Sequence, residues 1–437
     1  MKNLINQNSS VAYYCHFTQT ITLKRVEEQH VNAFLRALES EFPDEEIALV
    51  EGAQNFMRPM VHELRHWADM NCSIRGLQTL SNIFLFGFTT IHTLDQDVLR
   101  SNPYLAKLKK DLSLSFFVET HDPAQGEARY PWRFEITNSM PMYHEMLEHV
   151  SVCFFSQLDK KKEKLLFKSP IYLGSLLETT AYCQELIDAV PLLRGYKKWS
   201  DLSPMFELDE MNFIKDPSLP EYHCLAHAFA SAGGQEDVIA AFMFASAVAT
   251  ILLHMPRQMF RESCKKAIYW SEKRFPQSGL RRKMEICPEA GLICHLLDEM
   301  ALATRNDSSS FDEDLVYELF PYWKRERSVF FEKSHEEFKK FIDEHVRHHG
   351  APNYFPESIP ALIENNRYIL EQQSLCPTLL GLPKRPPIFC GDGHILVGSP
   401  EFQKVIGFYE KYPISDVARA MLPAELAPGL VRQILPR

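Results

Sequence analysis

The sequence predicts a mainly helical α+β protein, and three observations lead to that fold class. Apolar residues recur with helical spacing over most of the chain beyond residue 220, whereas strand-like alternation is confined to short stretches before residue 140. The hydrophobic content of 45% supports a large core, and 437 residues allow roughly two or three domains. The segment 195–220 is rich in Pro, Asp and Ser, so we expect it to separate an N-terminal domain, 1–200, from a helical domain, 201–437.

The N-terminal half is predicted to combine short strands with helices. Alternation at 17–23 predicts a strand, the apolar stripe of 27–38 predicts an amphipathic helix, and the apolar run 47–50 indicates a short strand. The next helix, 59–71, begins at Pro59, whose missing N–H has no partner in a first helical turn anyway. The same patterns predict the remaining elements of this half: a helix at 77–88, strands at 112–119 and 132–137, and helices at 142–155 and 172–190.

The C-terminal half is predicted to be helical, with one irregular segment near its end. Helices are expected near 221–232, 236–254, 257–273, 284–305, 331–348 and 357–372. The segment 383–398 is rich in Pro and Gly, so we expect a loop there, followed by a short helical end.

The composition favours a cytoplasmic protein that binds neither nucleic acid nor a membrane. The formal net charge is −10, and the basic clusters are short. Residues 1–10 are polar and lack the apolar core of a signal peptide, and ten scattered cysteines without a Cys-x-x-Cys pair are typical of reduced thiols. The longest apolar run, 238–255, is at the lower limit of membrane-spanning length and contains Ser246, Thr250 and His254, so we expect a buried helix.

The most informative motif is the sequence His-Glu-Leu-Arg-His at 62–66. Positions i and i+4 of a helix share one face, so His62 and His66 can bind the same zinc ion. Glu63 lies on the adjoining edge, where it can take a proton from a metal-activated water. Apolar neighbours such as Trp67 indicate a buried helix, in which these polar groups need partners that a metal would supply.

A catalytic zinc usually has three protein ligands, so a third side chain must come from elsewhere. Glu178 is the only charged residue in the apolar segment 169–184, and a carboxylate buried there would need a cation. Asp69 shares the helix face of His62, but seven residues of helix rise about 10 Å, too far for one shared ion. We expect Asp69 to accept a hydrogen bond from His66 or to lie at the helix end.

Other polar residues near the motif have competing interpretations. Arg65 lies off the metal-facing edge and is expected to point to solvent. The segment 143–149 is one residue too long for the motif, because its histidines are five apart and about 140° out of phase. Its side chains remain alternative ligands: His144, Glu145, Glu148 and His149. His223 and His227 have helical spacing but no accompanying glutamate, and are expected to be ordinary surface or core histidines.

These residues resemble the gluzincins, the thermolysin-like branch of the zincin metallopeptidases, in which a glutamate on a second helix completes a His₂Glu zinc site. The resemblance rests on His62, Glu63, His66 and Glu178 in their helical settings. It implies a zincin-like catalytic domain in 1–200, with zinc held by the two histidines and Glu178.

The resemblance also implies an activity, the hydrolysis of a peptide bond in a protein or peptide substrate. Glu63 would act as general base on a metal-activated water and pass the proton to the leaving amine. Tyr182, one turn after Glu178 on the same face, is the expected donor to the developing oxyanion, with His149 as the alternative.

Two other functions stay open at this point. One is a non-catalytic, zinc-stabilised helical protein with an interaction or regulatory role. The other is a helical interaction protein with no metal. In each case the helical domain, 201–437, suits the binding of a regulatory protein partner.

Overall fold

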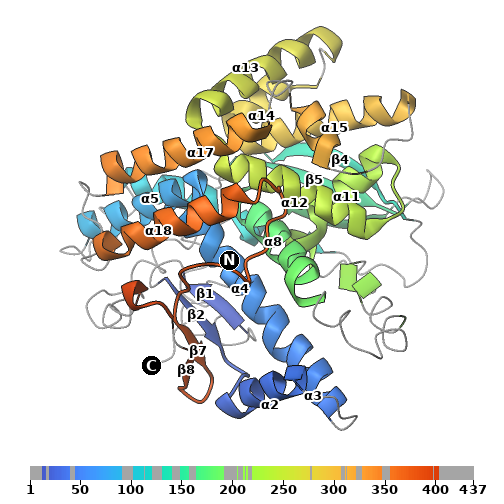
Figure 1. Ribbon diagram of the computed structural model, residues 1–437. Coiled ribbons are helices and arrows are strands. Elements are labelled where there is room, and N and C mark those ends of the chain that lie inside the picture. Colours follow the sequence, from blue (N-terminus) through green and yellow to red (C-terminus); the bar gives the residue numbers. More distant parts are fainter. Residues whose placement is uncertain are drawn as a thin grey trace.

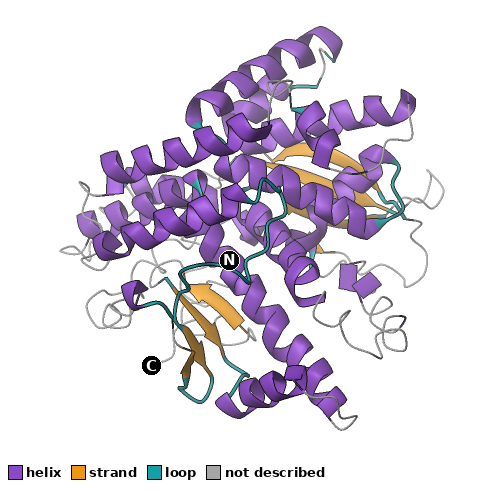
Figure 2. Cartoon of the chain, viewed as in Figure 1, coloured by secondary structure: helices purple, strands orange, loops and turns teal. Residues whose placement is uncertain are grey.

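The computed structural model is mainly helical with two four-stranded sheets, which confirms the predicted α+β class (Figures 1 and 2). It describes these residues: 12–15, 19–39, 45–90, 102–112, 114–120, 130–139, 148–156, 164–190, 204, 210–211, 213–214, 219–275, 278–306, 311, 313–320, 327–346, 355–396 and 398–402.

Helices make up most of the described chain. They are α2 (Glu28–Glu39), α3 (Glu45–Gly52), α4 (Arg58–Cys72), α5 (Ile74–Thr90), α7 (Pro103–Leu112), α8 (Leu173–Gln184), α11 (Pro220–Gly233), α12 (Val238–His254), α13 (Arg257–Arg274), α14 (Leu280–Ile286), α15 (Pro288–Asn306), α16 (Glu313–Leu319), α17 (Arg327–Phe341) and α18 (Phe355–Glu371). Shorter helical turns also occur, namely π-helical η1 (Ala53–Met57), η3 (Glu185–Ala189) and η4 (Ile342–Val346), and 3₁₀-helical η2 (Leu114–Phe117).

Most of the long predicted helices are confirmed. They correspond to α2, α4, α5, α8 with η3, α11, α12, α13, α17 and α18, and the helix expected at 284–305 is divided into α14 and α15 before Pro288. The run 47–50 lies in α3, so the predicted strand there is wrong. Four apolar residues are too few to distinguish a strand from a buried turn of helix. The short helices α7 and α16 were not predicted, although Leu105, Leu108 and Leu112 of α7 recur at helical spacing.

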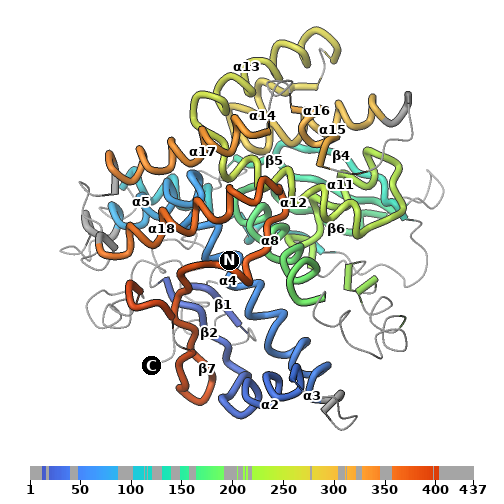
Figure 3. Tube along the Cα trace, in the orientation of Figure 1, coloured from blue at the N-terminus to red at the C-terminus, as the bar shows by residue number. Residues whose placement is uncertain are grey.

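The first sheet joins the two ends of the described chain. Its strands lie in the order β1 (Ala12–Cys15), β2 (Thr20–Leu23), β7 (Ile388–Cys390), β8 (Ile395–Leu396). Strand β2 pairs antiparallel with β1 and parallel with β7, so that Ile21 lies opposite Ile388. Figure 3 shows the red C-terminal hairpin beside the blue N-terminal strands. The predicted strand at 17–23 is confirmed from Thr20 onward, whereas the expected loop at 383–398 contains the β7–β8 hairpin.

The second sheet is antiparallel throughout and corrects two predictions. Its order is β3 (Glu119–Thr120), β6 (Leu165–Pro170), β5 (His149–Phe155), β4 (Arg133–Ser139). The strand at 132–137 is confirmed as β4, but the helix predicted for 142–155 is wrong from His149 on. Strand β5 is buried along nearly its whole length and therefore lacks alternation. The predicted strand at 112–119 is also wrong at 114–117, where η2 lies, although its last residue, Glu119, belongs to strand β3. Residues 142–147 lie outside the described residues.

The core consists of two clusters of buried residues with α8 between them. One cluster surrounds α4 and the first sheet, and includes Leu177 of α8. The other surrounds α11, α12 and the second sheet, and includes Leu176 and Tyr182 of α8. Helix α4 contacts β1, β2, α5, α8 and α18, so its residues are enclosed by segments from both ends of the chain.

The predicted domain boundary at 195–220 falls largely outside the described residues, and the C-terminal tail from 403 lies wholly outside them. Within the described part, α12 packs against α8 and α5. No single described helix has the length and apolar character needed to cross a membrane. Helices α11 and α12 reach that threshold only when taken together, and they are bent by 111° relative to each other.

Candidate metal centre

Helix α4 carries the two histidines on a deeply buried face. It continues directly from α3 through the π-helical turn η1, and Pro59 occupies its first turn. The backbone N–H of Arg58 donates to the carbonyl of Ala53, five residues earlier, which defines the wider π turn. Every residue of α4 from Val61 to Cys72 is buried, so the polar side chains on this helix must find partners inside the protein.

Three candidate ligand atoms meet where α4 faces α8. His62 Nε2 lies 3.1 Å from His66 Nε2, and Glu178 Oε2 lies 3.4 Å from His62 Nε2 and 3.5 Å from His66 Nε2. Ligand atoms about 2.0–2.1 Å from a tetrahedral zinc lie about 3.3–3.4 Å from one another. The observed triangle therefore has the size that zinc requires, and among the described residues it is the group of His, Cys, Asp and Glu side chains that could hold a metal.

Glu185 fixes the orientation of one of these ligands. His62 Nδ1 donates to Glu185 Oε1 over 2.8 Å, so that the neutral imidazole carries its proton on Nδ1 and its Nε2 lone pair faces the centre. Glu185 also accepts from Arg58 Nε at 2.7 Å, and Arg58 forms a further ion pair with Glu210. A carboxylate behind a histidine ligand is a common arrangement at zinc sites, because it orients the ring and raises its basicity.

The pKa values of the cluster reflect burial opposed by close charges. Burial disfavours the charged form of Glu178, but the adjacent His66 and His62 imidazoles hold the pKa of its carboxyl well below the usual range. Burial likewise opposes protonation of His62, yet Glu178 and Glu185 raise the pKa of its imidazole well above the usual value. The centre thus has a net affinity for positive charge, as a cation site needs.

Glu63 differs from Glu178 in its environment. Burial raises the pKa of Glu63, while His66, His62 and a hydrogen bond from the backbone of Tyr14 act in the opposite direction. A carboxylate with a raised pKa is better matched to accept a proton near neutral pH. The contact with strand β1 also fixes the carboxylate beside the cluster.

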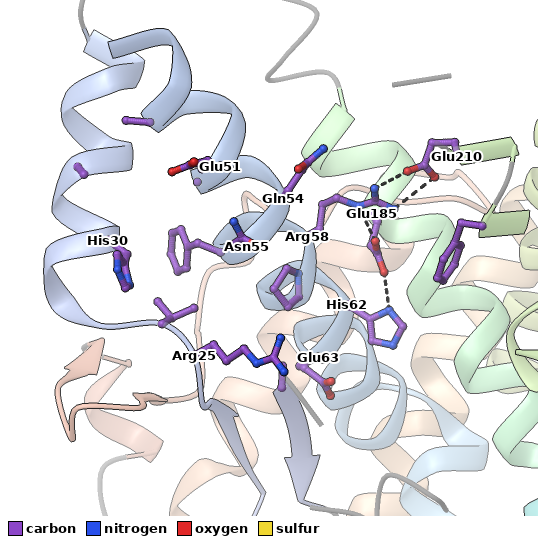
Figure 4. Close-up of a pocket in the computed structure, with 18 of the residues that line it drawn as sticks. Arg25, His30, Glu51, Gln54, Asn55, Arg58, His62, Glu63, Glu185 and Glu210 are labelled. Atoms are coloured by element: carbon purple, nitrogen blue, oxygen red, sulfur yellow. Dashed lines mark hydrogen bonds and ion pairs between the residues drawn. The ribbon is translucent and has the colours of Figure 1, made fainter. Parts of the chain in front are cut away.

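A groove of about 940 Å³ opens onto the centre (Figure 4). His62 and Glu63 lie at its inner side, and helices α2 and α3 with η1 line the opposite wall. Tyr222 of α11 also lines the groove, with its ring centroid 5.7 Å from that of His62. The volume is at the upper end of the range of ligand sites, about 300–1,000 Å³.

Arg65 points into the protein, so the expectation that it faces solvent is wrong. Its exposed fraction is 2%, and its guanidinium bonds Asp69 Oδ1 at 2.9 Å, Gln184 Oε1 at 3.0 Å and Thr250 Oγ1 at 2.9 Å. Asp69 accepts a second hydrogen bond from Thr180, 2.5 Å away. Asp69 therefore binds Arg65 and Thr180, and does not serve as the expected partner of His66.

Tyr182 and His149, the residues expected to stabilise the oxyanion, are both absent from the groove lining. The hydroxyl of Tyr182 donates to Glu210, and its ring stacks on Phe213, so Tyr182 belongs to the core and is absent from the groove lining. His149 lies on β5, where its ring stacks on Phe117 with a centroid distance of 4.6 Å.

The other candidate histidines have core surroundings. His227 bonds the carbonyl of Ile214 at 2.9 Å and packs against Trp132, and His223 lies in the same aromatic cluster. Both are buried. Of the two expected settings, surface and core, the core is therefore the one observed. The alternative ligands at 144 and 145 lie outside the described residues, and Glu148 is paired with Arg282 on the surface.

Arg58 and Glu185 were not predicted to belong to the site, although the sequence contains a signal for each. Arg58 precedes His62 by four residues and so shares its helix face. Glu185 follows Glu178 by seven residues, which returns it to nearly the same face two turns later. The two glutamates thereby contact opposite nitrogens of His62.

Comparison with known proteins gives no match of the chain to a family model, a curated protein or a solved structure. The function is therefore argued from the geometry of this centre.

Proposed function

We propose that the protein is a zinc-dependent metallopeptidase of the gluzincin type, with zinc held by His62, His66 and Glu178. One observation carries the proposal: two imidazole nitrogens and the Glu178 carboxylate oxygen form a triangle with sides of 3.1–3.5 Å. Glu63, which is not part of the triangle, lines the same groove as His62. Nitrogen and carboxylate ligands of this kind suit zinc. The ten cysteines are all free, which supports the cytoplasmic location expected from the sequence.

The residues around the centre have distinct roles in this proposal. When bound, zinc would polarise the scissile carbonyl and make a water molecule more acidic. Glu63 would take the proton from that water and deliver it to the leaving amine, a task that its raised pKa favours. Glu185 would keep the neutral His62 ring in the tautomer whose Nε2 lone pair faces His66 and Glu178, the other proposed ligands.

Tyr222 is better placed than Tyr182 to donate to the developing oxyanion. Tyr222 lines the groove close to His62, whereas the hydroxyl of Tyr182 is bonded to Glu210. A donor aimed at the developing charge typically contributes about 100-fold or more in rate. We therefore include Tyr222 in the proposed site as the oxyanion donor.

A structural zinc that joins α4 to α8 is the second candidate, because the centre lies where these two helices of the core pack together. The groove favours catalysis over this role. Structural zinc sites are usually closed by four protein ligands, whereas catalytic sites keep one position open to solvent and substrate.

The proposal is tested with Glu63→Gln, which keeps the size of the side chain and removes its basicity. Zinc-loaded wild type should cleave members of a mixed peptide library, and the variant should keep its zinc while cleavage falls by at least about 100-fold. Glu51→Gln is the matched control, since Glu51 lines the same groove from α3. No cleavage by the zinc-loaded wild type, or equal cleavage by Glu63→Gln, would contradict the proposal.

A further inference from the structure

The charges that line the groove are paired on one side of it and unpaired on the other. Among the described lining residues the arginines are Arg25 and Arg58. Arg58 lies between the carboxylates of Glu185 and Glu210 and is neutralised by them. Arg25 is exposed, and no acidic side chain of the described residues forms an ion pair with it.

We propose that Arg25 determines specificity by binding a carboxylate of the peptide substrate. The inference rests on the proposed function and adds the substrate class, a peptide with an acidic group on the Arg25 side of the scissile bond. A guanidinium presents paired N–H donors that match the two oxygens of a carboxylate, which makes arginine well suited to this recognition.

Arg25 lies close to the reacting residues. Figure 4 shows its side chain extending along the floor of the groove toward Glu63, and both residues line the same cavity. Glu51 lies on α3, well above Arg25 and Glu63 in this view. A substrate carboxylate could therefore pair with Arg25 next to the proposed catalytic centre. The acidic residues of the lining are Glu51, Glu63, and the Glu185 and Glu210 that Arg58 pairs with.

The backbone that carries Arg25 is held firmly by the C-terminal hairpin. Arg25 lies in the turn between β2 and α2, where Val26 N–H donates to the Leu23 carbonyl at 3.3 Å and Gly391 N–H donates to the Val26 carbonyl at 2.7 Å. Asp392 accepts from Glu28 N–H at 2.9 Å, at the start of α2. These contacts hold the turn against the hairpin, so the base of the Arg25 side chain is fixed.

The neighbours of Arg25 in this turn bring no charge to the groove. The Lys24 ammonium lies over the Tyr13 ring, 5.1 Å from its centroid, and Val26 is 2% exposed in the core. Close packing at Gly391 adds to this constraint, because a Cβ atom there would lie 2.0 Å from the Lys24 carbonyl oxygen. Val26 also lines the groove but is apolar, so Arg25 is the charged residue that this turn presents to it.

The carboxylate has two chemical sources, an acidic side chain or the free C-terminus of a peptide. Four peptide sets separate them: amidated peptides with Asp or Glu, amidated neutral peptides, neutral peptides with a free C-terminus, and amidated basic peptides. Preference for the first set identifies a side chain, and preference for the third identifies the terminal carboxylate.

Binding is measured first, in the zinc-loaded Glu63→Gln protein, by fluorescence anisotropy of labelled peptides. One carboxylate-bearing set should bind about 10-fold more tightly than the neutral amidated set, as expected for a charge-assisted contact. Adding Arg25→Gln should abolish this difference, and adding Arg25→Glu should favour the basic set. Adding Glu51→Gln should leave the preference intact. Direct coordination of peptide carboxylates by zinc would persist in Arg25→Gln, and that result would overturn the inference.

Cleavage by proteins with an intact Glu63 separates this inference from the proposed function. Arg25→Gln should raise KM for the preferred set about 10-fold while kcat on neutral peptides stays unchanged. Cleavage without any Arg25-dependent preference leaves the metallopeptidase proposal standing and refutes the role of Arg25. If peptides bind in an Arg25-dependent manner but no set is cleaved, the carboxylate site at Arg25 is supported and the metallopeptidase proposal is refuted.

Discussion

The contact between Glu185 and His62 predicts a measurable loss of zinc affinity when the carboxylate is neutralised. Glu185 Oε1 lies 2.8 Å from His62 Nδ1, and its other oxygen lies 2.7 Å from Arg58 Nε. In Glu185→Gln the amide oxygen can still accept from Nδ1–H, but the charge that makes Nε2 a stronger donor to metal is lost. Removing such a partner typically weakens metal binding by about 10- to 100-fold. We expect about 10-fold for Glu185→Gln and nearer to 100-fold for Glu185→Ala, or about 1.4–2.7 kcal/mol.

The assay is competition for zinc with a chromogenic chelator at fixed pH, with circular dichroism of the metal-free proteins to verify the fold. Glu210→Gln is the matched control, because it also removes a carboxylate from Arg58 but its contacts are with Arg58 and Tyr182 instead of His62. Unchanged zinc affinity in Glu185→Gln, or an equal loss in Glu210→Gln, would refute the reasoning.

Three further predictions concern the buried network, a buried histidine and the oxyanion donor. Asp69→Ala leaves the buried Arg65 guanidinium without its charge partner and should lower the free energy of unfolding by about 3–5 kcal/mol in urea denaturation, a loss that the double variant Asp69→Ala/Arg65→Met should partly restore. Burial lowers the pKa of His254 from 6.5 to about 4, so below pH 6.5 the unfolded chain takes up a proton that the folded protein refuses. Stability should then fall by up to about 3 kcal/mol between pH 6.5 and 4, and an unchanged pH profile in His254→Gln would contradict this. Tyr222→Phe should lower kcat by at least about 10-fold with little change in KM, whereas the same loss in Tyr182→Phe alone would return the role to Tyr182.

The ligand-bearing elements could be predicted because their signals are local. His62, Glu63 and His66 lie within five residues, and helical geometry alone puts the two histidines on one face. Glu178 was identifiable because a single carboxylate in an apolar segment needs a cation, and the structure places it 3.4–3.5 Å from both histidines. Local periodicity and one unsatisfied charge were sufficient to predict that these three side chains come together, and zinc binding by them remains the proposal.

The missed features depend on contacts between distant segments. Strands β7 and β8 span three and two residues, and the pairing of β7 with β2 has no local signature. Strand β5 is buried along nearly its whole length, so its apolar run resembles that of a buried helix. Arg65 is buried because Gln184 and Thr250 come from two other helices, and no pattern within α4 could show that.

Metal content per chain is the most direct test of the zinc centre. Elemental analysis should find about one zinc in the wild type and in Glu63→Gln, and none in His62→Ala or Glu178→Ala. That pattern would establish the His₂Glu ligand set and leave Glu63 for catalysis. Zinc retained by Glu178→Ala would move the third ligand elsewhere, and wild-type protein that takes up no zinc would contradict the account.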